Sequence, residues 1–267
     1  MKILGRKPER YILGLKRLPQ FLAASWRAFF IFKQPFLVIW SYLIRHAASG
    51  SMIRLRSGHV IYLSDDPADI VTVFLIFARE DYGRIEHGNN VIDIGANIGV
   101  FALFAAISGA KTVHAYEPSA SSYEVLLKNI KANGFDSIVK AEHLAAVGLP
   151  CAPVRFPRNS DVMNSILPDS SNIDDYDLVP TITLSEMVSR MNSIDLLKSD
   201  CEGAEYDIFL HGNEKDIAKI SEIRMEYHVG PRDELISKLT GLGYTVRQFM
   251  SEGIGGGYLW LTRNTPQ

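Results

Sequence analysis

The stretch that most constrains the fold is VIDIGANIG, from Val91 to Gly99, which an apolar run at residues 100–107 follows. It combines a short strand of buried character, a turn through two glycines and the start of a helix. At the first strand of an α/β sheet, this geometry brings the backbone close to a nucleotide-like ligand. The stretch therefore predicts the floor of a cofactor site.

The remainder of the chain repeats the alternation of strand and helix. Strands are predicted at residues 91–94, 112–116, 138–144, 194–200 and 220–228, and helices at 100–107, 121–133, 183–191, 205–210 and 233–242. A closing hairpin is predicted from 244–249 and 258–262. Such alternation implies a mostly parallel sheet with helices on both faces.

Three segments lie outside this alternation. Residues 52–63 alternate apolar and polar side chains around Ser57-Gly58, which predicts a β-hairpin, and a helix is predicted from Asp66 to about Ala78. Residues 148–180 are rich in Pro, Asn, Ser and Asp and predict a long loop. Loops of this length in a compact domain are often functional.

Charge divides the chain into two parts. Residues 1–56 hold 11 Lys and Arg against the single acid Glu9, whereas residues 57–267 hold 17 against 29. We therefore expect a basic helical arm at residues 1–50 and an acidic catalytic domain at residues 51–267. An acidic domain disfavours a nucleic-acid partner, because phosphate contacts need clustered Lys and Arg.

The arm is rich in apolar residues, but Arg27, Lys33 and Pro35 interrupt it before it reaches the length of a membrane span. It predicts one or two amphipathic helices with aromatic bulk. Two interpretations stay open: packing on the domain or on a second copy of the chain, and peripheral contact with an anionic membrane. Because Cys151 and Cys201 lie far apart, no disulfide framework is expected, and a cytoplasmic location fits. The second interpretation of the arm would place the protein peripherally at the inner face of the membrane.

The type of cofactor follows from what the glycine turn lacks. A dinucleotide site needs G-x-G-x-x-G, and this triplet is missing between Gly95 and Gly99. A carboxylate at Asp93 repels a diphosphate and attracts a sulfonium or ammonium group. Glu117, 18 residues beyond Gly99, ends the second strand, where a carboxylate can bind ribose hydroxyls. S-adenosylmethionine is therefore favoured, although Asp93 as a helix-capping acid and Glu117 as a solvated acid remain alternatives.

Four blocks together give the chain a family resemblance. They are VIDIGANIG at 91–99, AYEP at 115–118, LKNI at 127–130 with Asn133-Gly134, and IDLLKSDCEGAE at 194–205. From Tyr82 to Met250 the chain resembles the FkbM-like family of S-adenosylmethionine-dependent methyltransferases. The resemblance implies the class I methyltransferase fold, a Rossmann-like α/β three-layer sandwich whose seven-stranded, mostly parallel sheet has an antiparallel last strand.

The resemblance also implies roles for individual residues. Gly95, Ala96, Asn97 and Gly99 would hold the methionine part of S-adenosylmethionine, together with Asp93. Glu117 would hold the ribose. Glu142 and His143, after the third strand, would lie at the adenine edge, although His143 is equally compatible with a surface position.

The candidate catalytic residues follow the fourth and fifth strands. Asp200 and Glu202 lie at the edge of the sheet where open α/β folds place chemistry, and either could accept a proton from a hydroxyl. His228, at the end of the fifth strand, is another candidate base. Together with Glu226 these residues could instead bind a divalent cation, but we expect no metal, since carboxylate clusters also serve without one.

These observations predict an O-methyltransferase whose acceptor is a hydroxyl on a sugar, a glycan or a small secondary metabolite. Two alternatives are a nicotinamide-dependent oxidoreductase and a membrane-associated scaffold that binds a cofactor without turnover. The first needs the missing glycine triplet, and the second rests on the basic, aromatic arm.

Overall fold

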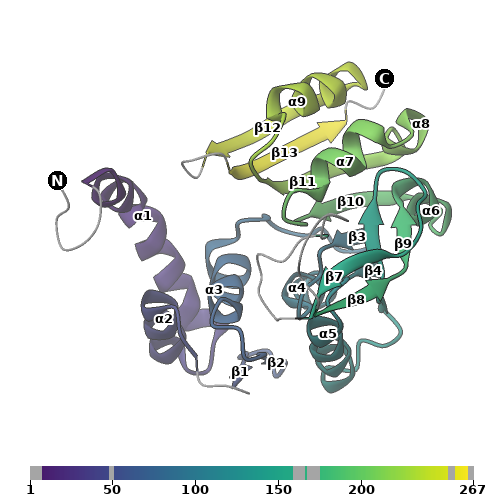
Figure 1. Ribbon diagram of the computed structural model, residues 1–267. Helices are drawn as coiled ribbons and strands as arrows, with labels where there is room; N and C mark the ends of the chain where they lie inside the picture. The colour runs from purple at the N-terminus through teal and green to yellow at the C-terminus, as the bar shows by residue number, and fades with distance from the viewer. Residues whose placement is uncertain (1–7, 48–50, 159–165, 167–174, 252–255, 264–267) are drawn as a thin grey trace.

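A seven-stranded sheet forms the centre of the computed structural model, which describes residues 8–47, 51–158, 166, 175–251 and 256–263 (Figure 1). The strand order is β12-β13-β11-β10-β3-β4-β5. The bounds are β3 Asn90–Ile94, β4 Thr112–Tyr116, β5 Val139–Glu142, β10 Ile194–Ser199, β11 Ile220–Tyr227, β12 Tyr244–Ser251 and β13 Gly257–Arg263. The last strand, β13, runs antiparallel to both β11 and β12. This confirms the class I methyltransferase fold.

The central strands are apolar because both of their faces are covered. Ile92 of β3 and Leu197 of β10 are paired in register and have no exposed surface. Strands that are buried on both sides read as continuous apolar runs, which is the pattern of 91–94 and 194–199. Since β3, β4, β10 and β11 are mutually parallel, their carboxyl ends meet at one edge of the sheet.

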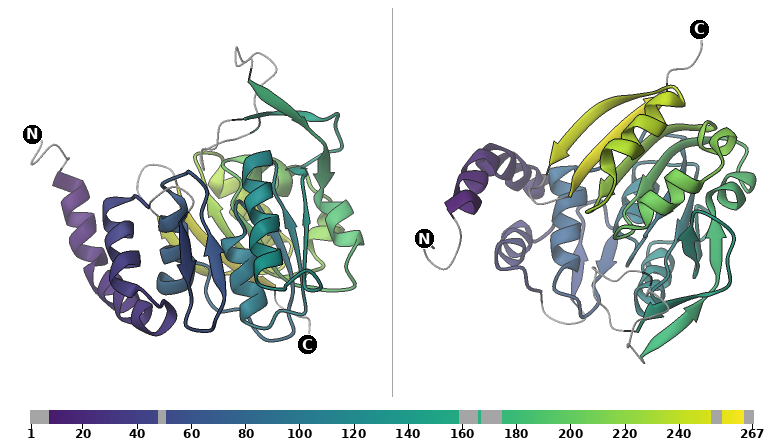
Figure 2. Two further views of the ribbon diagram at one scale, coloured as in Figure 1. Left: turned by 90° about the horizontal axis from the view of Figure 1, so that it is seen from below. Right: turned by 45° about the horizontal axis from the view of Figure 1, so that its top comes forward.

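Helices cover both faces of the sheet and divide the core in two (Figures 1 and 2). On one face lie α4 Val100–Ile107 and α5 Ala120–Ala132. On the other lie α6 Leu184–Ser189, α7 Ala204–His211, α8 Glu214–Ile217 and α9 Arg232–Gly241. A capping box of Thr183 and Glu186 begins α6, at the position that the sequence predicts.

Two of the predicted segments differ from the structure. The helix expected from Asp66 to Ala78 begins later, as α3 Asp69–Val73, and continues as a π-helix, η1 Phe74–Arg79. Its start is delayed because the Asp66 carboxylate accepts the backbone N–H of Ala68 in a turn, at 2.7 Å. A turn of this kind competes with the first turn of a helix.

The loop expected at residues 148–180 is only partly irregular. Within its described part, β7 Val154–Pro157 and β8 Tyr176–Val179 form an antiparallel pair. Just outside it, β6 Ala145–Val147 pairs with β9 Thr181–Thr183. Phe156 of β7 and Val179 of β8 are buried in a small cluster with Ala145 of β6. These strands have three or four residues each, too few for periodicity to distinguish them from loop.

The arm consists of α1 Pro8–Ile31 and α2 Pro35–Ile44, beside the hairpin of β1 Met52–Arg54 and β2 Val60–Tyr62 (Figure 2). One side of the arm packs on the domain through Ala24, Ala28 and Phe32, which are fully buried. The Arg27 guanidinium donates to the backbone carbonyls of Ala78, at 2.6 Å, and Arg79, at 3.1 Å. Among the described helices, none has both the length and the apolar character needed to cross a membrane.

Candidate functional site

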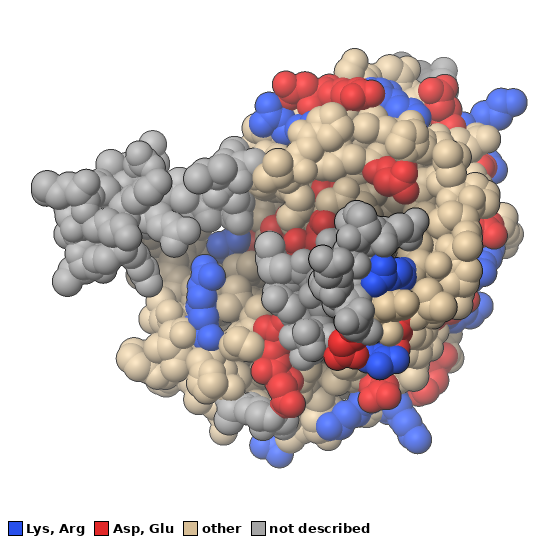
Figure 3. All heavy atoms as spheres, viewed as in Figure 1, with Lys and Arg blue, Asp and Glu red and all other residues tan. Residues whose placement is uncertain are grey.

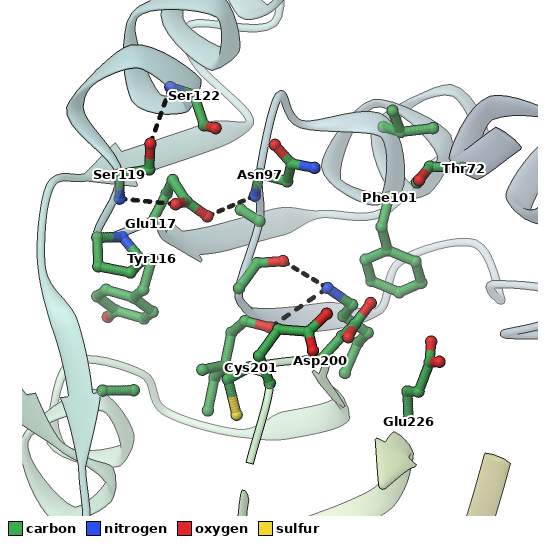
Figure 4. A pocket seen from close by; sticks show the side chains of 18 of the residues that line it. Thr72, Asn97, Phe101, Tyr116, Glu117, Ser119, Ser122, Asp200, Cys201 and Glu226 are labelled. Carbon is green, nitrogen blue, oxygen red and sulfur yellow. Dashed lines mark hydrogen bonds between the residues drawn. The ribbon is translucent and has the colours of Figure 1, made fainter. Parts of the chain in front are cut away.

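A cavity of about 610 Å³ opens at the carboxyl edge of the sheet. Its wall includes the turn after β3, the end of β4 and the end of β10 (Figure 4). Residues of α3 and Arg45, the residue that ends α2, complete the side nearest the arm. Open α/β sheets bind their ligands at this edge.

The turn after β3 needs glycine because the ends of β3 and β10 lie close together. Gly95 and Gly99 have φ values of 71° and 86°, and Asn97 has 50°, so three of five residues are left-handed. A Cβ at Gly95 would lie 1.8 Å from the carbonyl oxygen of Asp200, which makes glycine necessary there. Gly95, Ala96 and Asn97 line the cavity, whereas Gly99 does not and packs against Leu126.

The turn does not offer all of its backbone donors to a ligand. The N–H groups of Gly95 and Ala96 both donate to the carbonyl of Tyr116, at 3.0 and 3.1 Å. The N–H of Asn97 donates to the Glu117 carboxylate, at 2.6 Å. These bonds join the turn after β3 to the end of β4. The turn therefore contributes backbone surface to the cavity, while these three N–H groups are already used within the protein.

Asp93 lies behind that wall. It has no exposed surface and does not line the cavity, and its carboxylate is 3.1 Å from the Lys198 ammonium on the neighbouring strand. Burial raises the pKa of Asp93, and Lys198 opposes that shift. Lys198 also donates to the carbonyl of Gly95 at 2.7 Å. The pair therefore supports the turn from beneath, and the expected direct contact of Asp93 with a ligand is replaced by this ion pair.

Glu117 lies in the cavity wall at the end of β4. Its two carboxylate oxygens accept the N–H groups of Asn97 and Ser119, at 2.6 and 2.7 Å (Figure 4). Each oxygen keeps a further lone pair for a ligand hydroxyl. Burial raises the pKa of Glu117 to about 7, although the two N–H bonds lower it.

Glu142 and His143 lie outside the cavity. Glu142 forms an ion pair with Arg190, and the Nε2 atom of His143 is 2.8 Å from the carbonyl oxygen of Pro118. The wall on this side is built instead by small apolar residues immediately after them and by the ends of neighbouring strands. Those residues are Tyr116, Pro118, Leu144, Ala145, Ala146 and Phe156.

Acidic side chains from β10 and β11 face the opposite side of the cavity. Asp200, Glu202 and Glu226 all line it. The carboxylates of Asp200 and Glu226 lie on the same side in Figure 4, and Tyr82 donates its hydroxyl to Asp200 at 3.0 Å. Burial and the Asp200 charge raise the pKa of Tyr82 well above its usual value, which keeps this phenol protonated.

His228 is held between two carboxylates at the end of β11. Its Nε2 atom is 3.1 Å from Glu202, and its Nδ1 atom is 3.1 Å from Glu205. Burial opposes a charge on the ring, but the two carboxylates outweigh it and raise the pKa of His228 to about 11. An imidazolium at neutral pH has no lone pair for a proton, so the geometry favours Asp200 over His228 as a base.

Asp200, Glu202 and His228 also have the spacing of a metal site. In the part of the chain that the structure describes, one ligand atom from each lies within 4.8 Å of the others. They could hold a divalent cation if His228 released its proton. Glu202 and Glu205 both contact the His228 ring, so a cation at this place would compete with the proton that these carboxylates stabilise.

Three residues of the site could not be anticipated from the spacing of motifs. Lys198 stands within an apolar strand, and only the register of β3 against β10 identifies its partner Asp93. Tyr82 and Arg45 come from segments that precede the sheet, and the fold alone brings them to the cavity. The apolar residues Leu144, Ala145 and Ala146 could have been considered, because they lie at and directly after the end of the third predicted strand.

The chain is similar to known methyltransferases. The model of the methyltransferase FkbM domain matches residues 93–250, more than half of the chain. The 31-O-demethyl-FK506 methyltransferase FkbM of Streptomyces tacrolimicus is 27% identical over 200 residues, covering 61% of this chain and 75% of that protein. An uncharacterized protein of Methanocaldococcus jannaschii is 27% identical over 180 residues, covering 62% of this chain and 68% of its own length.

Solved structures share the architecture at low identity. An rRNA methylase of Streptococcus thermophilus has a TM-score of 0.44 and 9% identity, covering 68% of this chain and 90% of that one. TrmK of M. capricolum, in complex with S-adenosyl-homocysteine, has a TM-score of 0.43 and 12% identity, covering 67% and 64%. The fold assignment depends on the strand order of the sheet and not on these likenesses.

Proposed function

Because the chain belongs to the FkbM methyltransferase family, whose methyl donor is S-adenosylmethionine, we propose that it is an O-methyltransferase acting on a hydroxyl of a small molecule or glycan. The observation that carries the proposal is one cavity with a backbone turn and Glu117 on one side and Asp200 and Glu226 on the other. A donor can be held on the first side and a hydroxyl deprotonated on the second.

The residues present fit the methyl donor. The cavity is large enough for a ligand of that size, and Glu117 is buried in its wall with lone pairs left for both ribose hydroxyls. Tyr116, Pro118 and Leu144 to Ala146 supply an apolar surface on which an adenine ring would lie. Gly95 to Asn97 leave space for the methionine part, because no side chain larger than Asn projects from the turn.

The proposed chemistry is a single displacement. S-adenosylmethionine, when bound, supplies an electrophilic methyl group on a sulfonium. Asp200 would take the proton of the acceptor hydroxyl, whose oxygen would receive the methyl group, and the donor would leave as a neutral thioether. Tyr82 holds the Asp200 carboxylate in place through its 3.0 Å hydrogen bond. The protein chiefly aligns the two reactants, which is the largest contribution it can make to such a reaction.

Charge supports a neutral or cationic acceptor over a nucleic acid. Red acidic side chains gather in the hollow beside the arm in Figure 3, and Asp200, Glu202 and Glu226 line the cavity itself. These carboxylates repel a phosphodiester backbone. The relative from S. tacrolimicus is named for methylation of an oxygen on a small molecule, which agrees with this choice.

The test is methyl transfer from radiolabelled S-adenosylmethionine to a panel of sugars, glycans and hydroxylated metabolites. We expect Asp200→Asn to lower kcat by a factor of about 10² to 10⁴ while leaving donor affinity unchanged. Glu142→Gln, outside the cavity, is the matched control and should retain activity. Full turnover by Asp200→Asn would remove Asp200 as the base, and incorporation of label into RNA alone would overturn the acceptor class.

A further inference from the structure

The arm has an unpaired apolar surface on the side away from the domain. We call it the outer face; it consists of Leu22, Trp26, Phe30, Phe36, Leu37, Trp40, Leu43 and Ile44, with exposed fractions from 48% to 75%. Of the 14 large apolar side chains that are exposed in the described residues, nine belong to α1 and α2. Apolar groups that gather in one place on a surface mark an interaction site, whereas scattered ones do not.

The outer face is continuous across both helices. The rings of Trp26 and Phe30 meet edge to face, with centroids 5.5 Å apart. Phe29 lies 6.5 Å from Trp26 and 5.1 Å from Phe36, and so joins α1 to α2. These four rings therefore form one connected group that spans the two helices.

Folding of the arm does not require this surface. Leu22, Trp26 and Phe30 are spaced four residues apart and form one stripe of α1. The inward stripe is made of Ala24 and Ala28, which are fully buried against the domain. Phe32 also packs inward, but Trp26 and Phe30 point outward although two alanines of the same helix occupy buried positions, so packing against the domain does not account for these two large side chains.

The described charged side chains of α1 and α2 are basic. No Asp or Glu occurs from residue 10 to residue 64, and Figure 3 shows no red over the described part of α2. Lys33, Arg54 and Arg56 are exposed and lie together where α1 turns into α2, because Lys33 N–H bonds the Arg54 carbonyl and Arg56 N–H bonds the Ile31 carbonyl. Each such cation adds about 1 kcal/mol of attraction at an anionic lipid surface.

We propose that the outer face docks on the surface of an anionic phospholipid bilayer. Tryptophan and phenylalanine insert at the level of the lipid headgroups, and the adjacent cations bind the phosphates. Arg45 ends α2 in a left-handed conformation and also lines the cavity, so docking brings the rim of the cavity next to the headgroups. A second copy is a poorer partner for this face, because the cations Lys33, Arg54 and Arg56 beside the face of one copy would find no complementary charge beside the same face of the other.

Vesicle co-sedimentation of the full-length protein tests the proposal. We expect the wild type to bind vesicles of phosphatidylcholine with phosphatidylglycerol, to bind phosphatidylcholine alone much more weakly, and to be released by salt. The double variant Trp26→Glu/Trp40→Glu should lose affinity by about tenfold or more. The matched control is Leu127→Glu/Leu149→Glu, which changes two exposed leucines elsewhere and should bind like the wild type.

Sedimentation velocity without lipid tests the alternative that the outer face binds a second copy of the chain. If the wild type is a dimer that Trp26→Glu/Trp40→Glu converts to a monomer, and neither protein binds vesicles, the outer face is an interface between copies and the proposal is overturned. Equal vesicle binding by all three proteins would also overturn it. The melting temperature and the affinity for S-adenosylmethionine should be the same in all three, so a failure here is distinct from a failure of the proposed methyl transfer.

Discussion

At the scale of single residues, the site depends on two buried carboxylates that the fold treats differently. Asp93 faces the Lys198 ammonium and lies behind the cavity wall. Glu117 lies at the end of the neighbouring strand β4. Among the described residues, its hydrogen-bond donors are the backbone N–H groups of Asn97 and Ser119, and no cation forms an ion pair with it. The first carboxylate therefore has a positioning role, and the second is available to a ligand.

The pH dependence of donor binding follows from Glu117. Its pKa of about 7 means that the carboxylate is mostly protonated at pH 6 and mostly ionised at pH 8. Only the ionised form accepts hydrogen bonds with both oxygens, so affinity for S-adenosylmethionine should rise by about tenfold over this range. Stability has the opposite sign, because a carboxyl pKa raised on folding lowers the free energy of unfolding as pH rises from 4.5 to 7.

Isothermal titration at the two pH values measures the effect on affinity. In Glu117→Gln the affinity should be weaker and independent of pH. A profile that keeps the wild-type slope in this variant would mean that another group titrates.

Removal of the Lys198 ammonium should both destabilise the protein and loosen the turn. Lys198→Met leaves the buried Asp93 without its partner, which costs about 3–5 kcal/mol in the free energy of unfolding. It also removes the hydrogen bond to the Gly95 carbonyl, so donor affinity should fall. Urea denaturation and isothermal titration measure the two effects.

The double variant Asp93→Asn/Lys198→Met is the control for the buried charge. It should recover much of the lost stability while leaving donor binding weak. Full recovery of both would show that Lys198 acts through charge alone and does not position the turn.

The sequence indicates which residues line the cavity where they directly follow a predicted strand. Glu117 and Asp200 come directly after apolar strands, and both line the cavity. Glu142 and His143 do not line the cavity, since strand periodicity predicts the third strand but not which residues at its end turn inward. The partner of Lys198 depends on strand register, which one sequence does not contain.

At the scale of elements, the turn between β3 and α4 is fitted to the end of β10. Gly95→Ala places a Cβ 1.8 Å from the Asp200 carbonyl oxygen, so the turn must move and donor affinity should fall by more than about tenfold. Gly58→Ala is the control: its φ of 95° is also left-handed, but no atom lies within 4 Å of the added Cβ. It should lose about 1–2 kcal/mol of stability and bind normally.

Isothermal titration compares the two glycine variants. Equal donor affinity in both would contradict the close fit between the turn and β10.

Elements with strong periodicity were predicted well and short ones were not. The strands of the central sheet and α4 occur where the alternation of apolar residues places them. The β7 and β8 pair was missed because each strand has only four residues within a segment of turn-forming composition. Contacts between the two strands, such as Arg155 over the Tyr176 ring at 4.1 Å, depend on the fold and not on periodicity. The π-helix at 74–79 continues the apolar pattern of the α-helix before it, so the pattern does not distinguish the two kinds of helix.

At the scale of the whole molecule, the arm belongs to the fold as well as to the surface. Phe32 and Val38 are buried in the same core as α3 and α4. Deletion of residues 1–50 should therefore lower the melting temperature by about 10 °C, since loss of one buried Phe alone costs about 3–5 kcal/mol. Trp26→Glu/Trp40→Glu, which changes only the outer face, should melt with the wild type. A truncated protein with the wild-type melting temperature would show that the arm folds independently.

We propose that the cavity binds S-adenosylmethionine and that the Glu117 carboxylate holds its ribose hydroxyls. Isothermal titration of S-adenosylmethionine into the wild type, Glu117→Ala and Glu142→Ala tests it directly. We expect one site in the wild type, an unchanged site in Glu142→Ala, and affinity at least about tenfold weaker in Glu117→Ala. No binding by the wild type at millimolar donor, or equal binding by all three proteins, would contradict it.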